Sequence, residues 1–428
     1  MAGLSRRLVL LVVVPVVLAS LVAAGAGTLV HDLSSSPVPA REAPVEQQIL
    51  YSTLDGVTCP APDECLAVGD YLPSDGDAGV GDPDDDGLVP HALAEIGNGV
   101  SWRLLPTPGT GDRGSVLSDV SCVTSRDCVA VGYYQSSDDA ADGSSVSLQT
   151  PLVEIYDGRS WSLVATPSAP PDSILTSVSC PSRTTCVAVG FTTAGLSAGK
   201  PVESPFIEST LGGVWRRTQL PSAGSLSTSL LSVSCATPTT CIAVGESAPR
   251  NDVSATRPST SIFEAGKWRS LELPRAAQGP GALYGVDCTG LRSCIAVGSS
   301  SAFRSSGSAL VEFWNGAEWT TNSSVLRQPG DVVLTTVTCS SDSACIAAGS
   351  LSPSLGAPPQ ELLVRLGETS WQVLDLAARS DTLDAVTCIG QTRCLVVGSV
   401  ARNAFGNTES FIASWSGHSL AIEPSLTP

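Results

Sequence analysis

Cysteine is the residue whose type and spacing suggest chemistry most directly in this chain. The 14 cysteines form seven pairs, and each pair has five intervening residues. Such pairs could bind a metal, exchange between thiol and disulfide, or form structural disulfides. The pairs are Cys59/Cys65, Cys122/Cys128, Cys180/Cys186, Cys235/Cys241, Cys288/Cys294, Cys339/Cys345 and Cys388/Cys394.

Five intervening residues favour a structural disulfide. Zinc sites usually pair cysteines at closer spacing and need four ligands, and the chain has only three histidines to add. A redox pair would also need closer spacing and an activated thiolate. Facing residues of a β-hairpin lie about 4.5 to 5.5 Å apart between Cα atoms, within reach of a disulfide. We therefore predict seven local disulfides, each contributing about 2 kcal/mol.

The cysteine pairs belong to a phrase that recurs seven times. One copy reads TSVSCPSRTTCVAVG, from Thr176 to Gly190. A second half follows in each repeat, as in LVEIYDGRSW, which ends at Trp161. The seventh repeat departs from the pattern, because Leu420 stands where the tryptophan is expected. The equivalent tryptophans are Trp102, Trp215, Trp268, Trp319 and Trp371.

Each repeat predicts four strands. Alternation in LTSVSC places Val178 on one face and both Ser177 and Ser179 on the other. CVAVG is apolar on both faces, as expected of a strand that is covered on both sides. LVEIY supplies a third strand, a DG or NG hairpin turn follows, and the tryptophan lies on the fourth. Capped helical patterns are nearly absent.

Four strands in about 50 residues, repeated along a chain, are typical of a β-propeller. We therefore predict an all-β, seven-bladed β-propeller over residues 51–428, with four antiparallel strands and one local disulfide per blade. The first strand would be innermost and the tryptophan strand outermost. An open row of repeats would leave two ends that need caps. How the ring closes stays open, because the EQQIL stretch before Tyr51 could donate a strand. The predicted repeats span about 51–110, 111–168, 169–222, 223–276, 277–328, 329–378 and 379–428.

The motifs carry a family resemblance. The VSC-x5-C-x-AVG phrase, followed by G-x-x-W, resembles uncharacterised secreted repeat proteins of actinobacteria, over roughly residues 51–425. The repeat length resembles kelch-type propellers. The turn at Asp157, Gly158 and Trp161 also resembles the Asp-box hairpin of sialidase-type propellers, although Ile155 replaces the Ser or Thr of that motif. The resemblance implies a propeller fold, and Asp boxes have structural roles.

The N-terminus predicts export. Residues 1–30 begin with the basic MAGLSRR, and Leu8 to Val30 contains no charged residue. This pattern fits a cleaved signal peptide and equally a retained single-pass membrane anchor. Residues 31–50 contain three prolines and resemble a tether. Because dense disulfides also indicate an oxidising compartment, we expect an extracellular or cell-surface protein that meets membrane only through this segment.

The overall charge limits the partners. A formal net charge of −18 argues against nucleic acid and against anionic lipid surfaces. The same charge serves the solubility of an exported protein.

Residues for catalysis are sparse. The three histidines, His31, His91 and His418, lie in unrelated parts of the sequence, which leaves little basis for a Ser-His-Asp system. Third-strand glutamates could supply glycosidase carboxylates, but their repetition would spread them around the ring, and hairpin hydrogen bonding or a solvated face explains them better. Arginines recur in the cysteine loops, which favours a structural or solvent-facing role. The glutamates are Glu95, Glu154, Glu208, Glu264 and Glu312, and the arginines Arg126, Arg183, Arg292 and Arg393.

An acidic run could bind calcium. Asp82, Asp84 and Asp86 alternate before Gly87, and alternate carboxylates with a turn glycine suit this ion. The closing ligand of known loops is missing, because Leu93 and Pro90 stand at those places. We therefore favour a plain acidic loop without a cofactor, and keep calcium as the alternative.

Function is expected at the rim of the propeller. The variable loops between the second and third strands are longest in the first repeats, and loops on a rigid scaffold often recognise partners. Tyr71, Tyr133 and Tyr134 lie at the base of these loops and could contribute contacts. We expect a binding scaffold for a protein or envelope glycan rather than an enzyme. The alternative is a sialidase- or glycosidase-like hydrolase of glycans with an axial site.

Overall fold

The chain folds almost entirely into β-strands. The computed structural model describes residues 49–73, 89–108, 114–139, 145–167, 169–197, 199–221, 226–300, 307–321, 330–354, 359–366, 371–374, 381–390, 393–402, 407–417, 420–423 and 425. These residues contain 28 strands and one short 3-10 helix, Arg275–Ala277. The described part contains no helix of the length and apolarity that a membrane span needs. The hydrophobic stretch at Leu8 to Val30 lies outside it.

The strands fall into seven consecutive groups of four, here called blades 1 to 7. Blade 1 contains β1 (Ile49–Ala61), β2 (Glu64–Pro73), β3 (His91–Gly97) and β4 (Trp102–Leu104). Blade 2 contains β5 (Ser115–Thr124), β6 (Asp127–Asp139), β7 (Ser145–Tyr156) and β8 (Trp161–Leu163). Blade 3 contains β9 (Ser173–Ser182), β10 (Thr185–Ser197), β11 (Lys200–Leu211) and β12 (Val214–Thr218). Blade 4 contains β13 (Leu226–Thr237), β14 (Thr240–Pro249), β15 (Arg257–Glu264) and β16 (Lys267–Leu271).

The remaining blades repeat the pattern. Blade 5 contains β17 (Ala282–Gly290), β18 (Ser293–Ser300), β19 (Ser308–Trp314) and β20 (Trp319–Thr321). Blade 6 contains β21 (Asp331–Ser341), β22 (Ala344–Ser352), β23 (Gln360–Leu366) and β24 (Trp371–Val373). Blade 7 contains β25 (Asp381–Ile389), β26 (Arg393–Ala401), β27 (Thr408–Trp415) and β28 (Leu420–Glu423).

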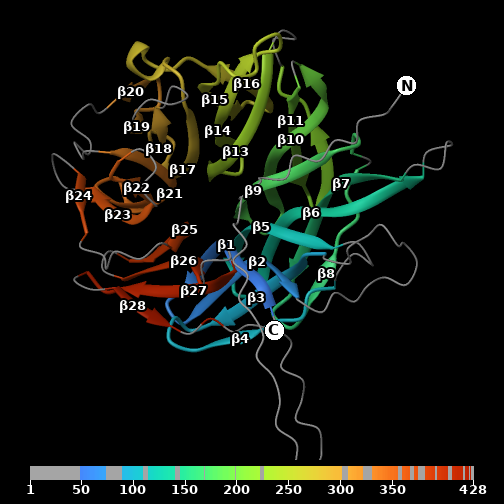
Figure 1. Ribbon diagram of the computed structural model, residues 1–428, viewed down its shortest axis with the longest axis vertical. Helices are drawn as coiled ribbons and strands as arrows, with labels where there is room; N and C mark the ends of the chain where they lie inside the picture. Colours follow the sequence, from blue (N-terminus) through green and yellow to red (C-terminus); the bar gives the residue numbers. More distant parts are fainter. Residues whose placement is uncertain are drawn as a thin grey trace, which may run out of the picture. The chain divides into compact units, whose positions relative to one another are not determined.

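The blades form a closed ring. Within each blade the strands pair antiparallel in chain order, and Figure 1 shows the first strands around the centre with the fourth strands at the rim. Each first strand contacts the first strand of the next blade, and β25 contacts β1. The prediction of an all-β, seven-bladed propeller with four antiparallel strands per blade is confirmed.

The seven predicted disulfides are present. Each joins the first two strands of one blade, and its Cα atoms lie between 3.9 and 4.1 Å apart, closer than the hairpin estimate. In five blades the two cysteines face each other directly in the strand register, as Cys122 and Cys128 do. The disulfides close the hairpin at one end of each blade. The connections between the second and third strands leave from the opposite end.

The second cysteine of each pair is buried in the core. Because the second strand is covered on both faces, its leading cysteine lies in the apolar cluster between two blades. Exposed disulfides are the ones that exchange readily, so this burial favours a structural role. The spacing of the cysteines gave no sign of it. The completely or almost completely buried ones are Cys65, Cys128, Cys241, Cys345 and Cys394, with Cys186 and Cys294 slightly more exposed.

Side chains of the first strands bond neighbouring blades together. The Oγ atom of Ser179 accepts a hydrogen bond from the backbone N–H of Cys235 at 3.0 Å. Ser177, two residues earlier, accepts one from the N–H of Val233 at 3.2 Å. The predicted alternation of Ser177 and Ser179 therefore directs both hydroxyls to the next blade. Equivalent bonds run from Cys180 to Ser121, from Cys288 to Ser234, from Cys339 to Asp287, from Val178 to Asp119 and from Val286 to Ser232.

The ring closes through hydrogen bonds between blades 7 and 1. A parallel bridge between Tyr51 and Thr408 joins β1 to β27, so the two blades count as one eight-stranded sheet. Ser52 accepts a bond from the N–H of Ser410 at 2.9 Å. Each blade keeps its own four strands. Ile49 and Leu50, the last residues of EQQIL, lengthen β1 within blade 1.

The core lies between blades. In one cluster, Ala130, Tyr156 and Trp161 of blade 2 pack against Leu66 and Leu105 of blade 1. Corresponding clusters join the other neighbours, and each fourth-strand tryptophan is buried in one. The second strands are covered on both faces, as the sequence indicated.

Two of the predicted long loops are largely β-structure. β6 and β7 stay paired as far as Asp139 and Ser145, and β10 and β11 as far as Ser197 and Lys200. The polar composition of these segments concealed the pairing.

The turn between β7 and β8 shows how the predicted Asp-box-like hairpin is built. The Asp157 carboxylate accepts the N–H groups of Arg159 (2.8 Å) and Ser160 (2.9 Å). Gly158 has a φ of 91°, which favours glycine at this place. The motif therefore stabilises a turn and has the structural role that the resemblance implied.

Candidate functional site

A pocket opens beside the third strand of blade 1. β4 pairs with β3 only from Glu95 to Gly97, so the first residues of β3 have no fourth strand beside them. The chain stays beside β3 at Leu105, whose N–H donates to the Ala94 carbonyl at 2.8 Å, and continues without strand pairing through Pro106 and Thr107. The resulting pocket has a volume of about 340 Å³.

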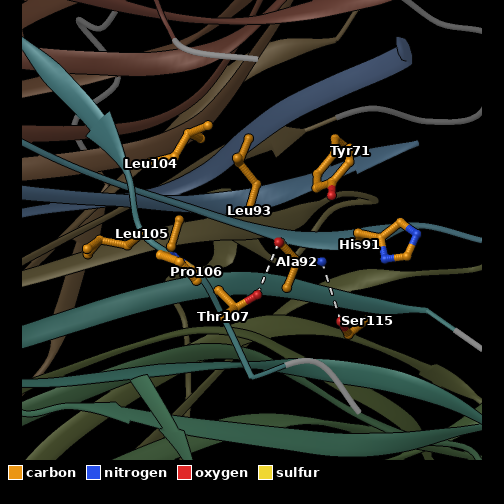
Figure 2. A pocket seen from close by; sticks show the side chains of 10 residues that line it. Tyr71, His91, Ala92, Leu93, Leu104, Leu105, Pro106, Thr107 and Ser115 are labelled. Carbon is orange, nitrogen blue, oxygen red and sulfur yellow. Dashed lines mark hydrogen bonds between the residues drawn. The ribbon is translucent and has the colours of Figure 1, made fainter. Parts of the chain in front are cut away.

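Two hydroxyl groups bond to the backbone at the pocket wall. The N–H of Ala92 donates to the Ser115 Oγ atom at 3.4 Å, and its carbonyl accepts from the Thr107 hydroxyl at 3.3 Å (Figure 2). These two bonds satisfy the backbone N–H and carbonyl of Ala92, which would otherwise form an open edge of β3. A ligand in the pocket would therefore contact side chains, because the strand edge is already hydrogen-bonded.

The pocket combines an aromatic pair with apolar walls. Tyr71 on β2 and His91 on β3 face each other in the register, and their ring centroids lie 5.4 Å apart. Leu104 and Leu105 line the wall away from this pair (Figure 2). Burial raises the pKa of Tyr71, so its phenol stays neutral around pH 7. Among the described residues that line the pocket none is a carboxylic acid, and its aromatic pair and apolar walls suit a ligand held by stacking and burial.

A second group of residues lies where blades 7, 1 and 2 meet around the axis. The first strand of every blade has a register shift that leaves one bulged residue without a partner on the second strand. In blades 1 and 7 the bulged residues are Asp55 and Asp384. The Thr53 hydroxyl lies 3.0 Å from the Asp55 carboxylate and 3.4 Å from that of Asp384.

Burial dominates the chemistry of these acids. It raises the pKa of Asp70 and of Asp384 to about 6, although hydrogen bonds from Tyr51 and Thr382 act in the opposite direction. It also raises the pKa of Asp55, helped by the negative charges of Asp70 and Asp384. Tyr51 donates to Asp70 at 2.8 Å. The Tyr51 hydroxyl thus bonds to Asp70, and the Thr53 hydroxyl bonds to Asp55 and Asp384. These acids lie at the contact between blades 7 and 1, here called the seam.

The bulge position was overlooked in the sequence. It is the residue after the recurrent leucine of the first strand, and its type varies among the blades, while that leucine and the valine two residues after the bulge recur in all seven. The residues are Asp55, Ser118, Thr176, Leu231, Tyr284, Thr335 and Asp384. Variation within an otherwise fixed phrase was the available signal.

A smaller polar pocket lies between blades 3 and 4. Glu203 of β11, Ser229 of β13 and Glu246 of β14 line it, and its volume is about 190 Å³. Burial, with the charge of Glu203, raises the pKa of Glu246. The Ser229 hydroxyl bonds to Glu203, which ties the two blades together here.

The three predicted rim tyrosines have different surroundings. Tyr71 lines the pocket of blade 1. Tyr134 packs against the apolar cluster between blades 1 and 2. Burial raises the pKa of Tyr133, with contributions from the charges of Asp70 and Asp55, which places its phenol near the axial acids.

The predicted metal site cannot be compared with the structure, because Asp82, Asp84 and Asp86 lie outside the described residues. Within the described part, no group of three or more His, Cys, Asp or Glu residues is placed to hold a metal ion. Calcium at the acidic run stays a prediction.

The expectation of a solvated face was wrong for four of the third-strand glutamates. Glu95, Glu154, Glu208 and Glu312 are completely buried. Each faces an alanine of the second strand, on a blade face that packs against the preceding blade. The alternative expectation, hairpin hydrogen bonding, holds for Glu312, which accepts from the Thr321 hydroxyl at 3.0 Å. Glu264 fits the solvated face, since it is exposed and lies 3.5 Å from Arg269 in its own hairpin.

The cysteine-loop arginines have the structural role expected of them where their contacts are known. Arg183 of blade 3 pairs with Asp127 of blade 2 at 3.2 Å. Arg393 of blade 7 donates to the carbonyl of Gly99 in blade 1 at 2.8 Å. Both side chains connect neighbouring blades.

Comparison with known proteins supports the fold alone. No protein-family model and no curated protein matches the chain. A Pyrococcus horikoshii acylaminoacyl peptidase is similar with a TM-score of 0.51 and 8% identity, over 88% of this chain and 53% of that one. YCF48 bound to D1 peptide gives 0.49 and 14%, over 82% and 92%. Sqt1 from Chaetomium thermophilum, bound to the N-terminus of ribosomal protein L10, gives 0.48 and 11%, over 89% and 91%. YCF48 and Sqt1 are β-propellers.

Proposed function

We propose that the chain is an exported, non-enzymatic binding protein that presents the blade 1 pocket to a protein or an envelope glycan outside the cell. The pocket between Tyr71, His91, Leu104 and Leu105 carries this proposal. Its aromatic rings and apolar walls offer stacking and burial, and its hydroxyl and imidazole groups offer hydrogen bonds to a neutral ligand.

Export is supported by the sequence and by the disulfides. All 14 cysteines are paired, which suits an oxidising compartment. The uncharged stretch from Leu8 to Val30 would act as signal or anchor. Fractionation of cells that express the full chain tests this part, because a cytoplasmic protein with reduced cysteines would contradict it.

One observation favours the hydrolase alternative. Burial raises the pKa of Asp70 and of Asp384 to about 6, a range in which a carboxyl group can act as a general acid. Both acids accept hydrogen bonds from hydroxyl groups at the seam, so a structural role in joining blades 7 and 1 also explains them, and that role is compatible with a binding protein.

A combined screen separates the two functions. The disulfide-bonded protein is applied to envelope glycans and envelope proteins, and each ligand is tested for retention and for cleavage. Retention without cleavage supports the binding protein. Cleavage that Asp384→Asn abolishes, while folding is kept, would establish the hydrolase instead.

A further inference from the structure

The buried third-strand glutamates distinguish some blade interfaces from others. Glu95 accepts a hydrogen bond from the Ser425 hydroxyl at 2.8 Å. In contrast, both carboxyl oxygens of Glu154 and of Glu208, and one of Glu312, are buried without a hydrogen-bond partner in the described structure. A buried carboxylate without donors is strongly disfavoured, whereas a protonated carboxyl group is tolerated at lower cost.

Glu154 lies between blades 1 and 2 in apolar surroundings. It faces Ala130 on its own sheet, and Tyr156 shares that face. No neighbouring charge contributes to the shift in its pKa, and apolar side chains of blade 1 pack there. They are Leu66, Val68, Ala92, Ala94 and Leu105. Burial is the cause that raises the pKa of Glu154 to about 7.

Glu208 and Glu312 occupy the same place in blades 3 and 5. Burial raises the pKa of each to about 7, opposed by the Arg217 charge for Glu208 and by the Thr321 hydroxyl for Glu312. Blade 2 packs valines toward Glu208, and blade 4 packs aliphatic residues toward Glu312. These residues are Val129, Val131 and Val153 in blade 2, and Ile242, Val244, Ile262, Leu273 and Ala277 in blade 4.

Three other interfaces lack a titratable group at this position. Ser261 in blade 4, Val364 in blade 6 and Ala413 in blade 7 stand where the glutamates stand elsewhere. The chain therefore contains natural replacements for the buried acid, within the same blade architecture.

We propose that the interfaces between blades 1 and 2, 2 and 3, and 4 and 5 are pH-sensitive joints, which pack tightly while the glutamic acid is protonated and loosen when it ionises. The packing stability that each joint contributes is complete below the ordinary pKa of glutamate, where folded and unfolded chains are both protonated. It is lost as the pH rises toward and through about 7. Ser261, Val364 and Ala413 cannot ionise, so this third-strand position gives no such response in blades 4, 6 and 7. Other acids whose pKa burial raises lie elsewhere in these blades, Glu246 between blades 3 and 4 and Asp384 on the first strand of blade 7.

Hydrogen–deuterium exchange on the full chain tests the proposal strand by strand. Exchange is measured at pH 5.5 and 8.5, and each rate is corrected for the intrinsic pH dependence of amide exchange. We expect protection of β7, β11 and β19 to fall by about tenfold or more relative to β23 and β27 at the higher pH.

Two kinds of variant make the test specific. Glu154→Gln keeps the shape of the side chain, and Glu154→Ser copies the residue of blade 4, so at least one is expected to fold. Either should remove the pH response of β7 while β11 and β19 keep theirs. Glu264→Gln is the matched control, because this third-strand glutamate is exposed. A response shared equally by all seven blades, or one that survives in both Glu154 variants, would overturn the proposal.

Discussion

The Ser425 hydroxyl donates a hydrogen bond to the buried carboxyl group of Glu95, at 2.8 Å and across 330 residues of sequence. Ser425 follows the last strand of blade 7, and Glu95 lies on the third strand of blade 1. Ser410 lies 2.8 Å from Ser425 and bonds in turn to Ser52. A chain of hydroxyl groups thus runs through the seam and closes the ring without a shared strand.

Ser425→Ala should therefore weaken the ring at its seam. The substitution leaves a buried carboxyl oxygen without this donor, at an expected cost of about 1 to 3 kcal/mol. Denaturant unfolding measures the loss. Ser254→Ala, at an exposed turn, is the control and should change little. Equal stability of the two variants would show that the seam does not depend on this bond.

Ser179→Ala tests the bonds between first strands. It removes the acceptor for the Cys235 N–H between blades 3 and 4, and an unsatisfied amide there should cost about 1 to 3 kcal/mol. Thermal unfolding of this variant is compared with that of Ser182→Ala, from the end of the same strand. A loss no greater than that of Ser182→Ala would refute a role in joining the blades.

Removal of one disulfide should have a similar effect in any blade. The seven loops have the same length, so the chain-entropy contribution of each is about 2 kcal/mol. The paired substitutions Cys180→Ser with Cys186→Ser, and Cys288→Ser with Cys294→Ser, are compared by denaturant unfolding. Peptide mapping without reduction should find each pair within its own repeat. A pair between repeats would contradict the fold.

The recurrent glycine of the AVG phrase should not tolerate a side chain. A Cβ atom at Gly190 would overlap the carbonyl oxygen of Ile174 on the facing strand, and the glycines of the other six blades meet the same obstacle. Gly190→Ala should cost about 3 kcal/mol or prevent folding, because the facing backbone must move. Gly279→Ala meets open space and is the control. Normal expression and stability of Gly190→Ala would be inconsistent with the close approach.

The repeat made the blade predictable, because seven copies of one pattern reveal strand order, cysteine pairing and the alternation of Ser177 and Ser179. Contacts between repeats were harder to predict from the sequence. The burial of Glu154 depends on the packing of blade 2 against blade 1, and a glutamate between apolar residues resembles an ordinary exposed strand position in sequence. Long-range packing was therefore the information that the pattern lacked.

The pocket, too, could be predicted only in part from the sequence. Tyr71 could be placed near a rim from its position after the AVG phrase. His91 becomes its neighbour only through the register of β2 and β3, across a connection whose length says nothing about pairing. The early end of β4, which opens the pocket, depends on where the chain departs toward blade 2.

The most direct measurement of the central claim is the affinity of pocket variants for the strongest ligand from the binding screen. Calorimetry compares the parent protein with Tyr71→Ala, His91→Ala and the control Val100→Ala, whose side chain is 70% exposed on a hairpin turn away from the pocket. We predict that each pocket variant loses tenfold or more in affinity, about 1.4 kcal/mol, while the control binds as the parent does. Unchanged affinity in folded Tyr71→Ala and His91→Ala would contradict binding at this pocket.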